Sequence, residues 1–289
     1  MRIRNSPIYS IIRIVIPCTV YYGVNLLVSA LFVSLFSAGF LFPEASAAES
    51  QALMQEYSYE LTIAIAVITI PVMAWMMRRD RKRAMISDIS REEPKVSALS
   101  YGMTAVLGVG ACFAVNHLLI LSGLTQIFSQ DIEEMSRVLY QNHLAAEIIG
   151  VGCIVPIAEE MVFRGLTMRR LREVFGPGAA IVLSAAIFGL FHGNLLQGIY
   201  AFLIGLLLAW VYERLGRITV PILLHASANL VSVIISDTDL LDFVYDDLSL
   251  FLAVTAGAVL LSGAALAVLY RASESLCSFL QNYFIYNIQ

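Results

Sequence analysis

Charged residues are scarce in this chain. Lys, Arg, Asp and Glu make up 14% of its 289 residues, whereas they make up about 25% of an average soluble protein. Apolar residues reach 59%, and the mean hydropathy is +0.78. This composition excludes an ordinary soluble domain and predicts an integral membrane protein. We therefore expect the lipid bilayer as a partner and no nucleic acid.

Cysteine and histidine are also scarce, with four residues of each. The cysteines show no paired spacing that would indicate disulfides or a zinc motif, and an HExxH sequence is absent. We therefore expect packing roles in or beside apolar spans for Cys18, Cys112, Cys153 and Cys277.

Long apolar runs, by contrast, are abundant. A transmembrane helix needs about 20 mainly apolar residues, and the chain contains eight candidate stretches, two of them short. They lie near residues 14–42, 61–77, 98–123, 144–163, 178–192, 198–213, 219–236 and 250–270. The sequence therefore predicts an all-α fold, a polytopic membrane helical bundle of about eight transmembrane helices.

The distribution of basic residues predicts the orientation of this bundle, because positively charged loops stay on the cytoplasmic side. If both termini are cytoplasmic, 17 of the 18 basic residues lie in cytoplasmic segments and only Arg137 lies outside. The outer segments 44–60 and 237–247 are then acidic. Omitting one span would invert the later loops, so the charge pattern also supports eight spans.

The spans divide the chain into three parts. Residues 1–139 hold three N-terminal transmembrane helices and a basic cytoplasmic loop at 78–97. Residues 140–236 hold the polar groups from which a catalytic core could be built. Residues 237–289 hold the last transmembrane helix and a C-terminal tail.

Ionisable residues at membrane depth are costly, and by default they mark a functional site or a pair. His143 and Glu147 lie near the outer end of a span, where we expect water and lipid headgroups to solvate them. Asn116 and His117 lie in the third span, where we expect a hydrogen bond between helices rather than a catalytic group.

The segment "IVPIAEEMVFRG" at 154–165 sets two carboxylates and an arginine in one apolar run. On a helix, Glu160 and Arg164 are four residues apart and can pair, whereas Glu159 points about 100° away from Glu160. Pro156 lacks a backbone N–H and is expected to kink or loosen the helix just before the carboxylates. Glu159 is therefore the free carboxylate, which can accept a proton from water as a general base.

Two histidines are expected at a similar depth. The turn signal at 176–178 begins 17 residues after Glu159, and His192 follows its first residue by 16. An antiparallel helical hairpin would place both side chains at the same depth. His225 and Asn229 are four residues apart on a later span, so they share one helix face on the cytoplasmic side of the membrane centre.

Three motifs in this part of the chain resemble those of a known family. The segments "EEMVFR" at 159–164, "FGLFH" at 188–192 and "HASAN" at 225–229 are similar to the EExxxR, FxxxH and HxxxN/D motifs of the CAAX protease and bacteriocin-processing (CPBP) family. That family comprises intramembrane glutamic endopeptidases related to the type II CAAX prenyl endopeptidases. The motifs occur in order without a departure at any motif position, and the resemblance covers residues 140–236.

The resemblance implies a role for each motif residue. Glu159 would activate the attacking water, and His192 would help to bind that water or move its proton. His225 and Asn229 would stabilise the oxyanion of the tetrahedral intermediate. Supporting residues would be Glu160, Arg164 and Phe188. The enzyme would need no cofactor, and its site would open toward the cytoplasm from the cell membrane to receive a hydrophobic or lipidated peptide or protein.

Two alternatives stay open. Glu159, His192 and His225 are a ligand set of the kind found in zinc hydrolases, so a zinc-dependent version of the same protease must be considered. The other alternative is a non-catalytic membrane protein that binds a peptide or gives immunity to a bacteriocin, since a fold does not by itself establish activity. The complete set of motif residues argues against a pure binder.

Overall fold

The computed structural model describes residues 7–44, 46–86, 95–129, 144–236 and 238–287. Within these residues every regular element is a helix and no strand occurs. By length and composition, seven of the helices could cross a membrane. The fold is therefore an all-α polytopic bundle, as the sequence predicts.

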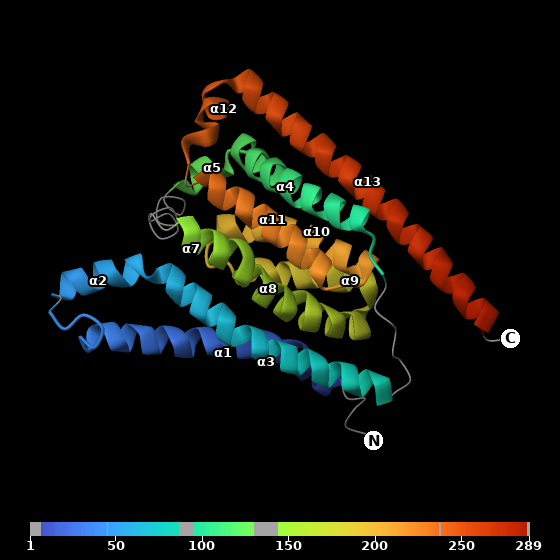
Figure 1. Ribbon diagram of the computed structural model, residues 1–289, viewed down its shortest axis with the longest axis horizontal. Coiled ribbons are helices and arrows are strands. Elements are labelled where there is room, and N and C mark those ends of the chain that lie inside the picture. The colour runs from blue at the N-terminus through green and yellow to red at the C-terminus, as the bar shows by residue number, and fades with distance from the viewer. Residues whose placement is uncertain (1–6, 45, 87–94, 130–143, 237, 288–289) are drawn as a thin grey trace.

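The helices follow one another from α1 to α13 (Figure 1). Their bounds are α1 (Pro7–Ser37), α2 (Ala47–Glu56), α3 (Ser58–Ile86), α4 (Ala98–Leu121), α5 (Leu124–Ile127), α7 (Leu144–Ile149), η2 (Gly150–Ile154), α8 (Val155–Glu160), η3 (Met161–Met168), α9 (Arg169–Leu190), α10 (Leu195–Leu215), α11 (Thr219–Ser236), η4 (Asp239–Leu241), α12 (Asp242–Asp246) and α13 (Leu248–Asn287). The elements η2 and η3 are π-helical, and η4 is a 3₁₀ turn.

The N-terminal helices form a hairpin with a short connecting helix. α1 and α3 pack side by side, and α2 joins them at one end (Figure 1). α2 was not expected from the sequence. It begins with a capping box, in which Ser46 and Glu49 each accept a hydrogen bond from the other's backbone N–H. α3 continues to Ile86, so the basic segment expected as a loop from residue 78 begins on a helix. Arg and Lys are good helix formers, and this extension costs little.

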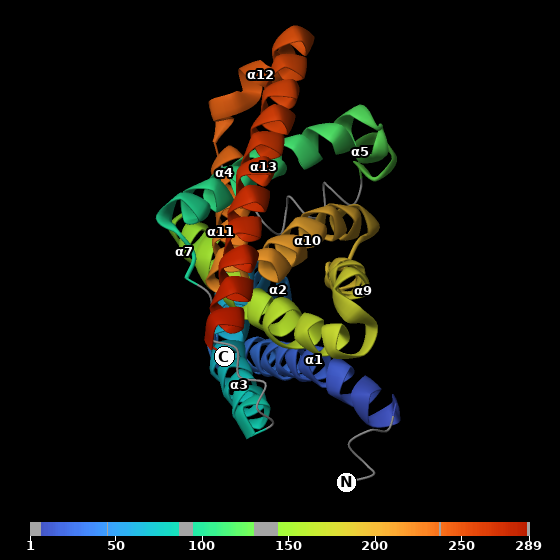
Figure 2. The same cartoon turned by 90° about the vertical axis from the view of Figure 1, so that its right-hand side faces the viewer.

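The stretch Leu144–Leu190 explains why seven membrane-length helices are found where the sequence suggested eight. The two predicted spans 144–163 and 178–192 form one helical stretch that is broken at Gly176, where φ is 80° and ψ is 174°. This left-handed φ suits glycine, and the chain reverses there (Figure 2). Residues 177–190 cover only about 20 Å at 1.5 Å per residue, less than the hydrocarbon core of a bilayer.

The two halves of this stretch pack against each other as a hairpin. The Ser184 hydroxyl donates to the Phe163 carbonyl at 3.2 Å, and the rings of Phe163 and Phe188 are 5.0 Å apart. Phe163 and Phe188 lie almost equally far along the chain from the turn at Gly176. Residues at nearly equal distances from the turn therefore lie side by side in this hairpin.

Two π-helical segments flank the short helix α8, which carries both carboxylates. The N–H of Val155 donates to the carbonyl of Gly150, five residues back, and Pro156 follows immediately. The expected loosening of the helix before the carboxylates is thus confirmed. The backbone hydrogen bonds there change from the α-helical to the π-helical register. Such π segments are rare and frequently occur at functional sites.

The segment that holds η2, α8 and η3 lies in the middle of the bundle. α1 and α3 pack on one side of it, while α4 packs against α11 and α13 on the other side (Figures 1 and 2). The main apolar cluster runs through these layers and includes Met73, Leu107, Phe163, Phe188, Leu208 and Leu224. The carboxylates of α8 are therefore surrounded by helices from distant parts of the chain.

Candidate active site

The two adjacent carboxylates of α8 have different surroundings. Glu160 and Arg164 are fully buried, and Arg164 Nη1 lies 2.9 Å from Glu160 Oε1, which is the pair that the sequence predicts. His225 Nδ1 also lies 2.9 Å from the same oxygen. Because a carboxylate only accepts hydrogen bonds, Nδ1 carries the hydrogen in this contact. Glu160 is thus compensated by two donors.

Glu159 is less enclosed than its neighbour. Its side chain is 14% exposed, and its Oε2 lies 3.7 Å from His225 Nε2. The imidazole of His225 therefore lies between the two carboxylates, with one ring nitrogen toward each. Arg164 pairs with Glu160, so Glu159 is the carboxylate that water can reach.

Arg164 is held by groups from two further helices. Its Nη2 donates to the Gly205 carbonyl on α10 at 3.0 Å, and its guanidinium carbon lies 4.5 Å from the centre of the Phe188 ring. A Cβ on Gly205 would lie 3.2 Å from Arg164 Nη2 and from the Phe188 ring. Because Gly205 has no side chain, α10 can approach closely enough for its carbonyl to bind the buried Arg164. The guanidinium thus contacts a carboxylate, a carbonyl and an aromatic face.

Phe188 contacts both histidines. Its ring is edge-on to His192, with centroids 4.5 Å apart, and to His225, with centroids 5.6 Å apart. The predicted apolar wall beside His192 is thus present. Together with Arg164, these contacts make Phe188 a common support for the site.

His192 lies beyond the end of α9, in the turn that precedes α10. Its Nδ1 is 2.8 Å from the Phe188 carbonyl, and the ring is partly exposed. In the described part of the chain, no hydrogen bond or ion pair joins His192 to Glu159. The helix ends at Leu190, so the chain leaves the path on which the depth matching was based.

Asn229 supplies a hydrogen-bond donor to the π-helical segment before the carboxylates. Its Nδ2 donates to the Val151 carbonyl at 2.9 Å. In a π-helical register this carbonyl would accept from residue 156, but Pro156 has no N–H. The Asn229 amide supplies the missing donor, and its second N–H is still available. His225 and Asn229 therefore do not direct their bound donors at one point, although they share a helix.

Tyr21 on α1 is a site residue that the sequence analysis missed. Its ring stacks on Phe191 with centroids 6.2 Å apart and meets Phe163 edge-on at 6.2 Å. Nothing in the sequence separates Tyr21 from its neighbour Tyr22, since tyrosines are common in membrane proteins. The position of Tyr21 beside the site becomes evident only from the packing of α1 on η3.

The residues of the zinc alternative are not gathered as a ligand set. Within the described residues, no group of three or more His, Cys, Asp or Glu side chains is placed so as to hold a metal ion. Glu159 and His225 approach each other, but His192 is directed to a backbone carbonyl. A chelation experiment is the direct test of metal dependence.

Several polar residues outside the motifs differ from expectation. Glu147 is fully buried rather than solvated, because α7 packs against α3 and α11. His143 and Arg137 lie outside the described residues. Among the cysteines, Cys18 and Cys112 are buried as expected, Cys153 is exposed, and the side chain of Cys277 is not described.

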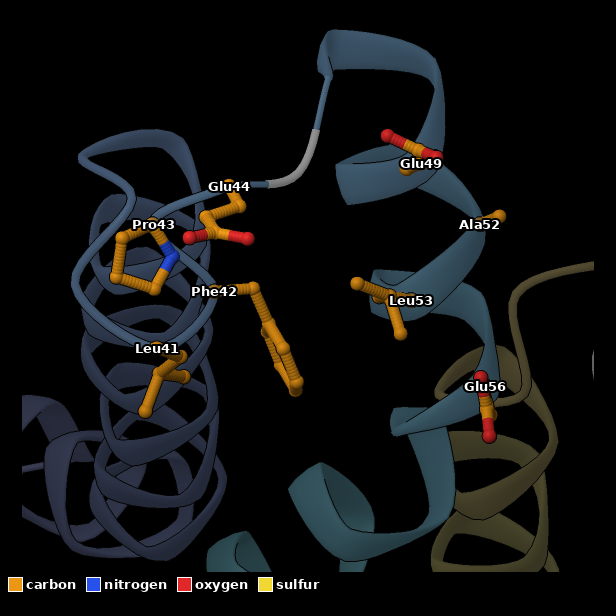
Figure 3. A pocket seen from close by; sticks show the side chains of 8 residues that line it. All are labelled: Leu41, Phe42, Pro43, Glu44, Glu49, Ala52, Leu53 and Glu56. Carbon is orange, nitrogen blue, oxygen red and sulfur yellow. The ribbon is translucent and has the colours of Figure 1, made fainter.

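A separate hollow of about 630 Å³ lies between the end of α1 and α2 (Figure 3). Phe42 and Leu53 face each other across it. Its lining residues are Leu41, Phe42, Pro43, Glu44, Glu49, Ala52, Leu53 and Glu56. None of them belongs to the motifs, so this hollow is not part of the candidate active site.

The bundle and its Glu–Arg–His centre define a polytopic membrane protein with a buried polar site. Residues 141–231 match the family model described as "Type II CAAX prenyl endopeptidase Rce1-like". This region of the chain is therefore similar to the Rce1-like family, and the match agrees with the motifs. The matched region contains every motif residue but not Tyr21.

Two curated proteins show a more limited similarity. The chain is 34% identical over 87 residues to "Putative membrane peptidase YdiL" of Bacillus subtilis (strain 168), which covers 30% of this chain and 36% of that protein. It is 28% identical over 121 residues to "UPF0177 protein YxdF" of Lactococcus lactis subsp. lactis (strain IL1403), which covers 40% of this chain and 67% of that protein. No solved structure matches.

Proposed function

We propose that this protein is an intramembrane endopeptidase that hydrolyses a peptide bond in a membrane-associated, hydrophobic or lipidated peptide or protein. The nucleophile is a water molecule that Glu159 activates. The similarity of residues 141–231 to the Rce1-like family and the similarity of the chain to the Bacillus membrane peptidase support a membrane peptidase. The glutamate mechanism and the substrate class are our proposals.

The difference between Glu159 and Glu160 carries this proposal. Glu160 is bound by Arg164 and His225 and cannot serve as a free base. Glu159 is partly exposed and has no arginine partner in the described residues, while His225 Nε2 lies 3.7 Å away. A carboxylate beside an imidazole in a mostly apolar site is suited to accept a proton from water.

The reaction then proceeds without a covalent intermediate. Glu159 takes a proton from water, and the water oxygen attacks the carbonyl carbon of the scissile bond. The second N–H of Asn229 and the imidazole of His225 stabilise the oxyanion, and His192 helps to hold the water. The proton on Glu159 passes to the leaving nitrogen as the C–N bond breaks, which yields a carboxylate and an amine.

The ion pairs near the site support an approach from the cytoplasm. Arg170 follows Arg164 by six residues, or about 9 Å along a helix, and it binds Asp80 at 2.9 Å. Arg13 also pairs with Glu173 at 2.9 Å. Basic residues gather on the cytoplasmic side of membrane proteins, so the scissile bond reaches Glu159 from the cytoplasmic interface.

The test compares peptide termini in membranes from cells that produce the wild-type protein or Glu159→Gln at equal levels. We expect a set of new termini with the wild-type protein and its loss with Glu159→Gln. Glu173→Gln removes an exposed carboxylate on α9 and serves as the matched control. Termini that persist in Glu159→Gln would contradict catalysis by Glu159 and favour the peptide-binding alternative.

The metal and lipid questions need purified protein in lipid nanodiscs. Internally quenched apolar peptides with and without a C-terminal prenylated cysteine serve as probes. Faster cleavage of the prenylated probe supports a lipidated substrate, whereas equal rates support a hydrophobic peptide. We expect activity to survive strong chelators; a complete loss that zinc restores would favour the zinc-dependent version.

A further inference from the structure

An open apolar hollow of about 480 Å³ lies on the surface of the bundle between α9, α10 and α13. α13 packs mainly on α4 and makes only a few contacts with α10, so a groove stays between α10 and α13. None of the residues that line the hollow belongs to the three motifs. Its lining includes Ile181, Leu206, Leu207, Trp210, Leu266 and Tyr270.

The apolar walls of this groove lead to a basic side chain. Arg214 lies in the last turn of α10, four residues after Trp210. Leu206 precedes Arg214 by eight residues, or about 12 Å along the helix. The charge pattern of the sequence predicts that this end of α10 is cytoplasmic. The groove would then run from the apolar interior of the bilayer to a cation at the level of the lipid headgroups.

Arg214 is held by aromatic rings from both sides of the groove. Its guanidinium carbon lies 5.7 Å from the centre of the Trp210 ring on α10 and 4.7 Å from the centre of the Tyr270 ring on α13. Stacking on a ring uses the face of the guanidinium plane. The N–H groups lie in that plane and stay directed at its edge, where they can bind two oxygens of one phosphate group.

We propose that this groove binds an anionic phospholipid, with an acyl chain along the leucines and the phosphate at Arg214. The exposed Arg271 follows Tyr270 directly, and Arg217 lies just beyond the end of α10. The exposed Glu274, four residues after Tyr270, offsets only part of this positive charge. Basic pockets between transmembrane helices on the cytoplasmic side are suited to anionic headgroups.

α3 carries a similar pair that serves as a control. Arg79 lies four residues after Trp75, and its guanidinium carbon is 5.4 Å from the centre of that ring. Neither residue lines the groove, and Trp75 is 58% exposed. This pair therefore has the same stacking and the same charge, so it separates binding in the groove from the ordinary placement of an arginine at a membrane surface.

The test uses the fluorescence of Trp210. The chain has two tryptophans, so Trp75→Phe leaves Trp210 alone. The full-length variant is placed in vesicles of phosphatidylglycerol and phosphatidylcholine, in which one lipid at a time carries brominated acyl chains that quench tryptophan. We expect Trp210 to prefer phosphatidylglycerol about fivefold, the scale on which one basic residue attracts an anionic lipid surface.

Arginine variants in the same background locate the headgroup. Arg214→Gln should remove most of the preference at Trp210, whereas Arg79→Gln should leave it unchanged. Arg214→Lys keeps the charge and should retain a larger part of the preference than Arg214→Gln, which shows that loss of charge and not a disturbed helix is the cause.

Three results would overturn the proposal. Equal quenching of Trp210 by the two brominated lipids would mean unselective contact with the bilayer. A preference that survives in Arg214→Gln would place the headgroup elsewhere. If Trp210 is shielded from both lipids while Trp75 is quenched in Trp210→Phe, a second copy of the chain covers the groove instead. The experiment measures no cleavage, so its outcome is independent of the proposed function.

Discussion

His225 and His117 are both buried histidines in membrane-spanning helices, 4% and 1% exposed. Each uses Nδ1 in a hydrogen bond, to Glu160 at 2.9 Å in one case and to Thr255 at 2.8 Å in the other. Each also lies against aromatic rings: Phe188 contacts His225, and Phe251 stacks on His117 at 4.3 Å. Burial, a hydrogen bond and an aromatic neighbour are therefore not sufficient to define a site.

The two histidines differ in the charge around them. His225 lies between Glu160 and Glu159, and Glu160 is paired with Arg164. His117 bonds a hydroxyl that joins α4 to α13, and its aromatic neighbours carry no charge. The first arrangement can respond to the movement of a proton, whereas the second can only hold two helices together.

Arg164→Met should give the largest effect, because it removes the charge that compensates Glu160. Glu160 would remain fully buried with one donor, His225. Breaking a buried pair from one side costs about 3–5 kcal/mol, so we expect a large fall in the free energy of unfolding. Equilibrium unfolding in detergent micelles would measure it.

The double variant Glu160→Gln/Arg164→Met is the control for this prediction. It removes both charges and should recover part of the stability lost in Arg164→Met. If the double variant is less stable than Arg164→Met alone, uncompensated charge on Glu160 is not the cause of the loss.

His225→Asn and His117→Asn test the comparison directly. The asparagine amide can replace Nδ1–H, so the bonds to Glu160 and Thr255 can persist, whereas the group at Nε2 is lost. We expect kcat to fall about 100-fold for His225→Asn, the usual scale for losing a directed catalytic group. For His117→Asn we expect less than a twofold change in cleavage of the quenched peptide. Similar losses in both variants would make the distinction between the two histidines wrong.

The features that the sequence could predict depend on short separations along the chain. The Glu160–Arg164 pair follows from a spacing of four residues, and the hairpin at Gly176 follows from the turn signal at 176–178. The bond of His117 to another helix follows from the cost of a polar group at membrane depth. Each of these rests on local geometry or on the bilayer as solvent.

The features that the sequence could not predict depend on which helices become neighbours. Tyr21 reaches Phe163 only because α1 packs on η3, and Asn229 reaches Val151 only because α11 lies beside η2. Glu147 is buried for the same reason. The predicted number of spans was too high because the helix after Gly176 is apolar but shorter than the hydrocarbon core of a bilayer. A hydropathy pattern alone does not distinguish such a short helix from a full span.

The smallest expected effect concerns Glu49, an exposed carboxylate that contrasts with the buried Glu160. Hydrogen bonds from Ser46 hold the pKa of the exposed Glu49 below its usual value. A lowered pKa stabilises the folded state above the unfolded-state value, and this contribution disappears as the pH falls through the lowered value. Ser46→Ala should move the pKa of Glu49 back toward its usual value in an NMR titration, and Ser50→Ala in the same helix should not. Because solvent screens Glu49, neither change should affect cleavage, whereas any loss of the Glu160 pair should.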